Sequence, residues 1–162
     1  RSDMSSPFVP LALLALTTAC IAVPARAVAA PAACPAGQTT VFACTTSNGK
    51  QVQVCDAGAT LGYTFGRPGQ RPELTFHVAR ERASTWQWQG IGRYMNYSVS
   101  LPNGKARYTV FSSVDRLADE PEPSLGISVE VQGRHVAQLT CEQEGSIENL
   151  FDIDLPADTP AP

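Results

Sequence analysis

The sequence lacks the residue patterns of a catalytic or metal site. Its two histidines, His77 and His135, have no histidine or cysteine at metal-ligand spacing, and we predict both on strand surfaces. No Gly-x-Ser-x-Gly elbow or Cys-x-x-Cys redox motif is present. Asp152, Asp154 and Asp158 lack the glycine and glutamate of a calcium loop and are interpreted as a solvated tail. We therefore predict that the protein is not an enzyme and uses no metal or cofactor.

An excess of positive charge is also absent. The formal net charge of the 162 residues is −3, which, together with a predicted export signal, argues against nucleic-acid binding. The charge is unevenly divided: from Asp115 onward, eleven carboxylates face only Arg116 and Arg134, whereas basic residues predominate over residues 34–114. Such asymmetry either steers a charged partner or is neutralised when the two halves of the chain fold together.

The N-terminal residues resemble a processing signal. Residues 1–3 precede Met4 and are interpreted as a cloning remnant, and an apolar run too short to span a bilayer as a helix leads to Ala25-Arg26-Ala27. This pattern predicts a signal peptide over 4–27 and a periplasmic or secreted protein. In the alternative, residues 16–20 resemble a bacterial lipobox, and lipidation at Cys20 would make an outer-membrane lipoprotein, the only predicted membrane contact.

A hairpin is predicted over 42–55, where Asn48-Gly49 separates two alternating runs. With a three-residue loop over 47–49, Cys44 lies opposite Val52 and Cys55 points to the other face of the sheet. With a two-residue loop, Cys44 meets Gln53 and Cys55 is a diagonal neighbour roughly 7–8 Å away. Either register disfavours a Cys44–Cys55 disulfide.

Four cysteines remain when Cys20 is set aside, an even number in an oxidising compartment. Cys34 lies upstream of the first strand, near the open end of the hairpin, where Cys55 also lies. Cys141 ends a run that would place it on one face with Ala137 and Leu139. We therefore predict the disulfides Cys34–Cys55 and Cys44–Cys141, each stabilising by about 2–4 kcal/mol.

Short alternating segments continue along the chain, with a second hairpin at Asn103-Gly104 and a last short strand over 150–153. They predict an all-β fold, a small antiparallel β-barrel or sandwich of about eight strands, braced by disulfides. We expect a linker over 28–38, one domain over 39–155 and a disordered tail over 156–162. The spacing of Trp86 and Trp88 places both indoles on one side of a strand, either in the core or as an exposed platform for a sugar ring.

The export signal, the first strand ending near Cys44, the small antiparallel barrel and the late cysteine resemble bacterial periplasmic inhibitors of c-type lysozyme and similar small exported β-proteins. Members of that family present a Ser-Gly loop, followed by a basic residue and tyrosine, to the enzyme's cleft. The nearest stretch, residues 103–108, reads Asn-Gly-Lys-Ala-Arg-Tyr; it lacks the serine and has one extra residue. The resemblance implies a non-enzymatic inhibitor or immunity protein directed against a lysozyme-like cell-wall hydrolase.

For such an inhibitor the predicted binding surface combines a basic anchor for the cleft with a carboxylate loop that complements a cationic enzyme. The predicted residues are Lys105, Arg107 and Tyr108 in the anchor and Asp119, Glu120 and Glu122 in the acidic loop, which Pro121 and Pro123 stiffen. The alternative is a small-ligand or glycan-binding envelope module whose ligand face is Trp86 and Trp88.

Overall fold

The structure is a computed structural model that describes residue 31 and residues 33–158. The cloning remnant, the predicted signal peptide and Cys20 lie outside the described residues, as does part of the predicted linker. Across the described part of the chain, no helix is long and apolar enough to cross a membrane.

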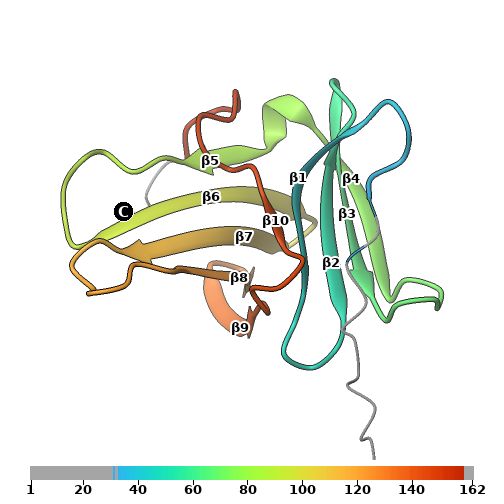
Figure 1. Cartoon of the computed structure of the whole chain (residues 1–162). Helices are drawn as coiled ribbons and strands as arrows, with labels where there is room; N and C mark the ends of the chain where they lie inside the picture. The colour runs from blue at the N-terminus through green and yellow to red at the C-terminus, as the bar shows by residue number, and fades with distance from the viewer. Residues whose placement is uncertain (1–30, 32, 159–162) are drawn as a thin grey trace, which may run out of the picture.

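The described residues form two five-stranded antiparallel sheets, and in Figure 1 the strands of one sheet run across those of the other. The first sheet has the order β10-β1-β2-β3-β4, with strands β1 (Thr39–Thr45), β2 (Gln51–Asp56), β3 (Thr60–Gly66), β4 (Leu74–Ala79) and β10 (Ile147–Glu148). The second has the order β5-β6-β7-β8-β9, with strands β5 (Ser84–Trp86), β6 (Tyr94–Asn103), β7 (Ala106–Asp115), β8 (Pro123–Val131) and β9 (Arg134–Thr140). A 3-10 turn, η1 (Arg80–Arg82), joins β4 to β5. The predicted all-β fold is confirmed as a sandwich; the sheets do not close into a barrel.

The hairpin of β1 and β2 has the register expected for a three-residue loop. Cys44 pairs with Val52, and the amide of Thr46 donates to the carbonyl of Lys50 at 2.7 Å across residues 47–49. Gly49 closes the loop with a φ of 76°, a left-handed conformation that glycine adopts without a steric penalty. Cys44 is therefore buried on the core face, and Cys55 lies on the opposite face of the sheet.

The two disulfides join Cys34 to Cys55 and Cys44 to Cys141, the pairing that the hairpin register predicts. Their Cα–Cα distances are 5.8 and 5.7 Å, within the range that a disulfide spans. Cys44–Cys141 ties β1 of the first sheet to the residue that follows β9 of the second. Both disulfides indicate that the protein folds in an oxidising compartment, extracellular or periplasmic.

The core lies between the sheets, because each strand directs its apolar side chains to one face. Its largest fully buried members are Phe42, Val52, Val54 and Leu61 from the first sheet and Val99, Leu101, Val110 and Ile127 from the second. On the outer face of the second sheet, Gly126 of β8 allows the ring of Phe111 to lie close. A Cβ added at Gly126 would be 2.6 Å from that ring and 2.5 Å from the carbonyl oxygen of Leu139.

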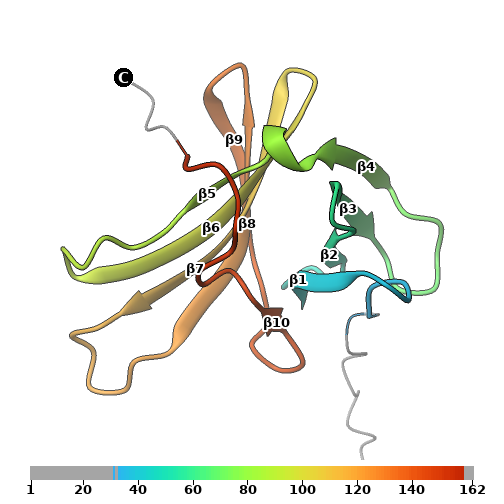
Figure 2. The ribbon, with the colours of Figure 1, turned by 90° about the horizontal axis from the view of Figure 1, so that it is seen from above.

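Residues 149–158, here called the strap, run from the first sheet to the second after β10 (Figure 2). The amide of Asn149 donates to the carbonyl of Val41 at 2.9 Å, and Leu150 is fully buried in the core. Farther along, the guanidinium of Arg80 donates to the carbonyl of Asp154 at 2.7 Å. The last short strand predicted over 150–153 is wrong, because the pairing with β1 ends at β10 and Asp152 takes a left-handed φ of 54°.

The prediction of a disordered tail from Pro156 is wrong for residues 156–158. Ala157 forms a parallel bridge with Thr85 of β5, so the strap covers the edge of that strand. The amide of Thr85 donates to the carbonyl of Pro156 at 2.8 Å, and the amide of Asp158 donates to the carbonyl of Thr85 at 2.7 Å. Residues 159–162 lie outside the described residues.

Candidate functional site

The turn between β6 and β7 presents Lys105 to solvent. Asn103 and Ala106 are the last paired residues, so the loop consists of Gly104 and Lys105. Gly104 has a φ of 62° at the first loop position, the position that a type II′ turn reserves for glycine. The carbonyl of Lys105 accepts from the amide of Gln132 at 2.9 Å, which fixes the turn beside the β8–β9 turn. The predicted anchor residue Lys105 is therefore exposed on a short, fixed turn.

Tyr108 points the other way, toward the core. Its ring centroid lies 5.2 Å from that of Tyr63 and 5.3 Å from that of Phe76, and Tyr63 and Phe76 stack at 5.0 Å. The three rings come from β7, β3 and β4 and so join the two sheets. Burial raises the pKa of the Tyr63 hydroxyl, because a phenolate there would lose its hydration. This position of Tyr108 favours a packing role over direct contact with a partner.

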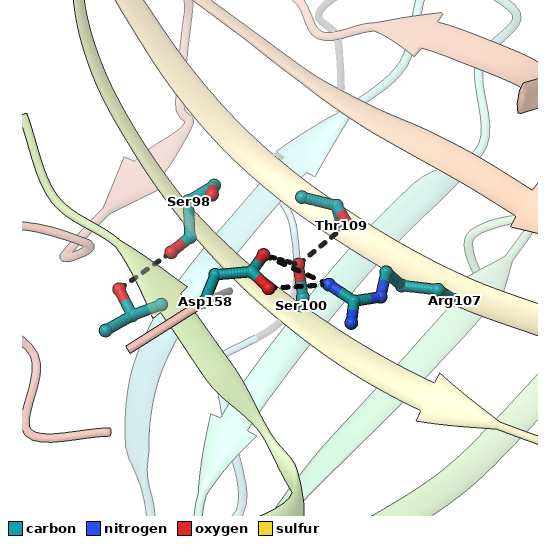
Figure 3. Close-up of polar contacts among 6 residues, drawn as sticks. Ser98, Ser100, Arg107, Thr109 and Asp158 are labelled. Atoms are coloured by element: carbon teal, nitrogen blue, oxygen red, sulfur yellow. Dashed lines mark hydrogen bonds and ion pairs between the residues drawn. The ribbon is translucent and has the colours of Figure 1, made fainter. Parts of the chain in front are cut away.

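Arg107 lies on the outer face of the second sheet, where its guanidinium binds Asp158 of the strap (Figure 3). Nη1 donates to the two carboxylate oxygens at 2.8 and 3.0 Å, and the Asp158 side chain is 18% exposed. The hydroxyl of Ser100 donates to the same carboxylate at 3.2 Å and is hydrogen-bonded to the hydroxyl of Thr109 at 2.9 Å. Arg107, predicted as part of the anchor, is thus engaged within the chain, and Asp158 is not the solvated residue that the sequence suggested.

The Arg107–Asp158 cluster lacks the geometry of a nucleophile. Ser100 is 1% exposed while residues 156–158 cover it, and its hydroxyl is hydrogen-bonded to Thr109 and Asp158, with no histidine of the described residues in the cluster. Across the described residues, no group of three or more His, Cys, Asp or Glu side chains is placed to hold a metal ion. The arrangement holds a carboxylate; it does not activate a hydroxyl.

Trp86 and Trp88 do not lie on one side of a single strand, as their spacing predicted. β5 ends at Trp86, which is 40% exposed, so the alternation that would align Trp88 stops before it. Trp88 lies in the following loop, where its indole N–H donates to the carbonyl of Ile91 at 2.9 Å. The guanidinium carbon of Arg116 lies 5.1 Å from the centre of the indole, a cation–π contact. Trp88 therefore braces a loop.

The loops over residues 87–93 and 116–122, here called the braced loops, lie at one end of the second sheet and are fixed to each other. Arg93 binds Asp115 through both carboxylate oxygens, at 2.6–2.9 Å, and Arg116 donates to the carbonyl of Gly92 at 3.0 Å. The hydrogen bonds from Arg93 hold the pKa of the Asp115 carboxyl below its ordinary value of 3.8. Asp115 also accepts from the amide of Leu117 at 3.0 Å, which positions the start of the acidic loop.

The braced loops expose two large aliphatic side chains beside carboxylates. Ile91 is 84% exposed and Leu117 is 68% exposed, on segments that Arg116 and Gly92 join directly. The three predicted acidic residues, Asp119, Glu120 and Glu122, follow Leu117 and are all exposed. Within the described part of the chain they form no ion pair, whereas other carboxylates of the second half pair with arginines of the first.

The structure does not bring the two predicted parts of the binding surface together. Lys105 precedes β7 and the acidic loop follows it, so the ten residues of this strand separate them. At the usual rise per strand residue this is about 30 Å along the chain. The anchor and the acidic loop would therefore contact separate parts of a partner. Sequence reasoning missed Ile91 and Leu117, which carry no chemical motif and are noticed only through their exposure.

No protein-family model, curated protein or solved structure matches this chain. Its function is therefore inferred from its own residues, and the resemblance to lysozyme inhibitors stays a prediction.

A cleft of about 180 Å³ lies on the outer face of the first sheet. Its floor is formed by Gln51, Gln53 and Thr64 and its wall by the proline-containing turn over residues 66–72. Neither tryptophan lines it. The predicted ligand face at Trp86 and Trp88 thus lies apart from this cleft.

Proposed function

We propose that this protein is a non-enzymatic, exported binding protein that blocks a cationic, lysozyme-like cell-wall hydrolase, as an inhibitor or an immunity protein. The observation that carries the proposal is the exposure of Ile91 and Leu117 on the braced loops, directly beside Asp119, Glu120 and Glu122. An apolar centre with a charged rim is the usual anatomy of a protein interface.

Ile91 and Leu117 are suited to act as anchors. Burying each side chain in a partner's cleft would contribute about 1.5–3 kcal/mol. The loops that carry them are already fixed by Arg93, Asp115 and Trp88, so binding would lose little conformational entropy. The proposed interface therefore needs no rearrangement of the loops.

The carboxylates define the partner's charge. Asp119, Glu120 and Glu122 have no ion-pair partner within the described residues, so their field is free to attract a basic surface. On the braced loops themselves, Arg93 is paired with Asp115 and Arg116 lies over Trp88, so the three carboxylates outnumber the remaining positive charge there, and Lys105 lies at the far end of β7. The expected result is fast association that slows as salt is added.

The test is inhibition of a c-type lysozyme, measured as the clearing of a bacterial cell-wall suspension and as binding kinetics on a surface. We expect the pair Ile91→Ala and Leu117→Ala to speed dissociation by about tenfold or more, since loss of an anchor acts on the off-rate. Neutralising Asp119, Glu120 and Glu122 to their amides should instead slow association and flatten its salt dependence. Val136→Ala, another exposed aliphatic residue on β9, is the matched control and should change neither rate.

Other outcomes would contradict the proposal. If Lys105→Ala abolishes inhibition and the braced-loop variants inhibit fully, the binding surface is the β6–β7 turn. If wild-type protein neither binds nor inhibits c-type lysozymes or other cationic peptidoglycan hydrolases, the function is wrong. Binding to glycans that Trp86→Ala removes would then support the alternative, an envelope module that recognises sugars.

A further inference from the structure

The edge of β5 is covered by a short segment of the strap, residues 156–158, that is largely exposed to solvent. Pro156 and Ala157 are exposed, so backbone pairing with Thr85 supplies their contacts at this edge. Asp158 is the exception, because its carboxylate reaches across the outer face of the sheet to Arg107. The segment is therefore held by one strand pairing and one charged side chain.

The other half of this contact is built into the sheet. Ser100 of β6 and Thr109 of β7 are paired in register and joined by a hydroxyl–hydroxyl bond of 2.9 Å, and Ser100 is 1% exposed. Arg107 stands two residues from Thr109 on the same face of β7. Ser84 of β5 pairs with Ser100, and its short side chain allows a carboxylate from the edge to reach these groups. Hydroxyls and a guanidinium on strand positions form a fixed receptor for a carboxylate.

We propose that this region, the edge of β5 with Ser100, Thr109 and Arg107, is a docking site for an extended acidic peptide of a protein partner, and that residues 156–158 occupy it in cis. The strand edge supplies backbone hydrogen bonds for any extended segment, as in recognition by strand addition. The guanidinium selects a segment with a carboxylate at the position of Asp158. The resident segment competes at high effective concentration, so a partner must displace it.

The chemistry of the site favours a peptide over a free anion. Thr85 makes two backbone hydrogen bonds to the segment: its amide donates to the carbonyl of Pro156, and its carbonyl accepts from the amide of Asp158. Only a peptide has a carbonyl and an amide on the two sides of one residue, here Ala157. These two bonds lie beside the carboxylate contact, so an aspartate in a strand satisfies all of them at once. This inference does not depend on the proposed function, since the braced loops are separate from Arg107.

The test uses the peptide Leu155–Asp158, acetylated and amidated, and a chain that ends at Leu155, with circular dichroism to establish that it folds. We expect the peptide to bind, and its Asp158→Asn form to bind at least about tenfold more weakly, since a hydrogen-bonded charge is lost. Arg107→Ala in the protein should weaken binding similarly. Arg134→Ala, an exposed arginine on β9, is the control and should leave binding unchanged. Equal binding of the two peptides, or unchanged binding to the Arg107→Ala protein, would overturn the proposal.

A second measurement on the whole chain decides the matter even if the shortened chain unfolds. Hydrogen exchange of the Asp158 amide reports displacement of the resident segment. The added peptide should speed that exchange while the Thr85 amide stays protected, because an incoming carbonyl replaces that of Pro156. The asparagine peptide should have about tenfold less effect at the same concentration. If saturating peptide leaves the exchange of the Asp158 amide unchanged, the segment is a fixed part of the fold and the docking site does not exist.

Discussion

Replacing Cys44 and Cys141 with alanine should destabilise the protein more than replacing Cys34 and Cys55. The first pair is 97 residues apart in sequence and the second 21. A disulfide that closes a longer loop restricts the unfolded chain more, and loop-closure entropy alone gives about 4.7 kcal/mol for the first and about 3.3 kcal/mol for the second. Entropy therefore predicts a difference of about 1.4 kcal/mol.

Burial increases this difference. Cys44 and Cys141 are both buried, whereas in the other pair Cys55 is buried and Cys34 is partly exposed. Removing one more buried sulfur adds about 1 kcal/mol, roughly the transfer free energy of a group of that size. The expected total difference is about 2.4 kcal/mol.

The backbone contacts between the sheets should remain in the Cys44→Ala, Cys141→Ala variant. The amide of Ser47 donates to the carbonyl of Thr140 at 3.0 Å, and the amide of Glu142 donates to that of Thr45 at 2.8 Å, so the folded state keeps its junction. The assay is urea unfolding followed by tryptophan fluorescence, with the quadruple variant as a test of additivity. An equal loss of stability in the two double variants, or a larger loss without Cys34–Cys55, would refute the reasoning.

Two further changes test the core and the outer face. Burial raises the pKa of Tyr63 above 10.0, so as the pH rises the unfolded chain loses the phenolic proton before the folded chain does. The free energy of unfolding should therefore be unaffected by this group below about pH 10 and should fall above it, by up to about 1.4 kcal/mol per pH unit. Tyr63→Phe should flatten this loss in melting curves; a parallel decline in both proteins would contradict the assignment. Gly126→Ala should destabilise by about 1–3 kcal/mol in urea, because its methyl group would collide with the ring of Phe111 and with the carbonyl of Leu139. Adding Phe111→Leu to the Gly126→Ala variant should restore the part of the lost stability that is due to the collision with the ring. If Gly126→Ala is as stable as wild type, the backbone has shifted to make room for the methyl group and the prediction is wrong.

The local features of the fold could be predicted from the sequence. Asn48-Gly49 predicted the first hairpin, because the loop needs a positive φ that glycine adopts readily, and both possible registers disfavoured Cys44–Cys55. The pairing of Cys44 with Cys141 followed from the faces on which alternation places them. These inferences rely on turn geometry and on the alternation of side chains along a strand, both of which depend on neighbouring residues in the sequence.

The contacts of the site could not be predicted in the same way. Arg107 and Asp158 are 51 residues apart and meet only because the strap crosses to β5, which no local pattern indicates. Trp88 is not in the predicted strand, because β5 ends at Trp86. Its indole instead contacts the carbonyl of Ile91 and the guanidinium of Arg116 in the loops. Such positions depend on how separate segments pack, so the sequence identifies the residues and leaves their partners open.

The long sequence separation of the Cys44–Cys141 disulfide has a consequence for the order of assembly. As the chain enters an oxidising compartment from its N-terminal end, Cys34, Cys44 and Cys55 become available within 21 residues of one another, whereas the partner of Cys44 follows 97 residues later. During that interval Cys44 could form a non-native disulfide with Cys34 or Cys55. Early closure of the β1–β2 hairpin would place Cys55 on the opposite face and leave it to Cys34, so the turn at Asn48-Gly49 would act as a kinetic selector of disulfides. Slow hairpin closure should thus appear as scrambled disulfides in newly oxidised chains, before any loss of final stability.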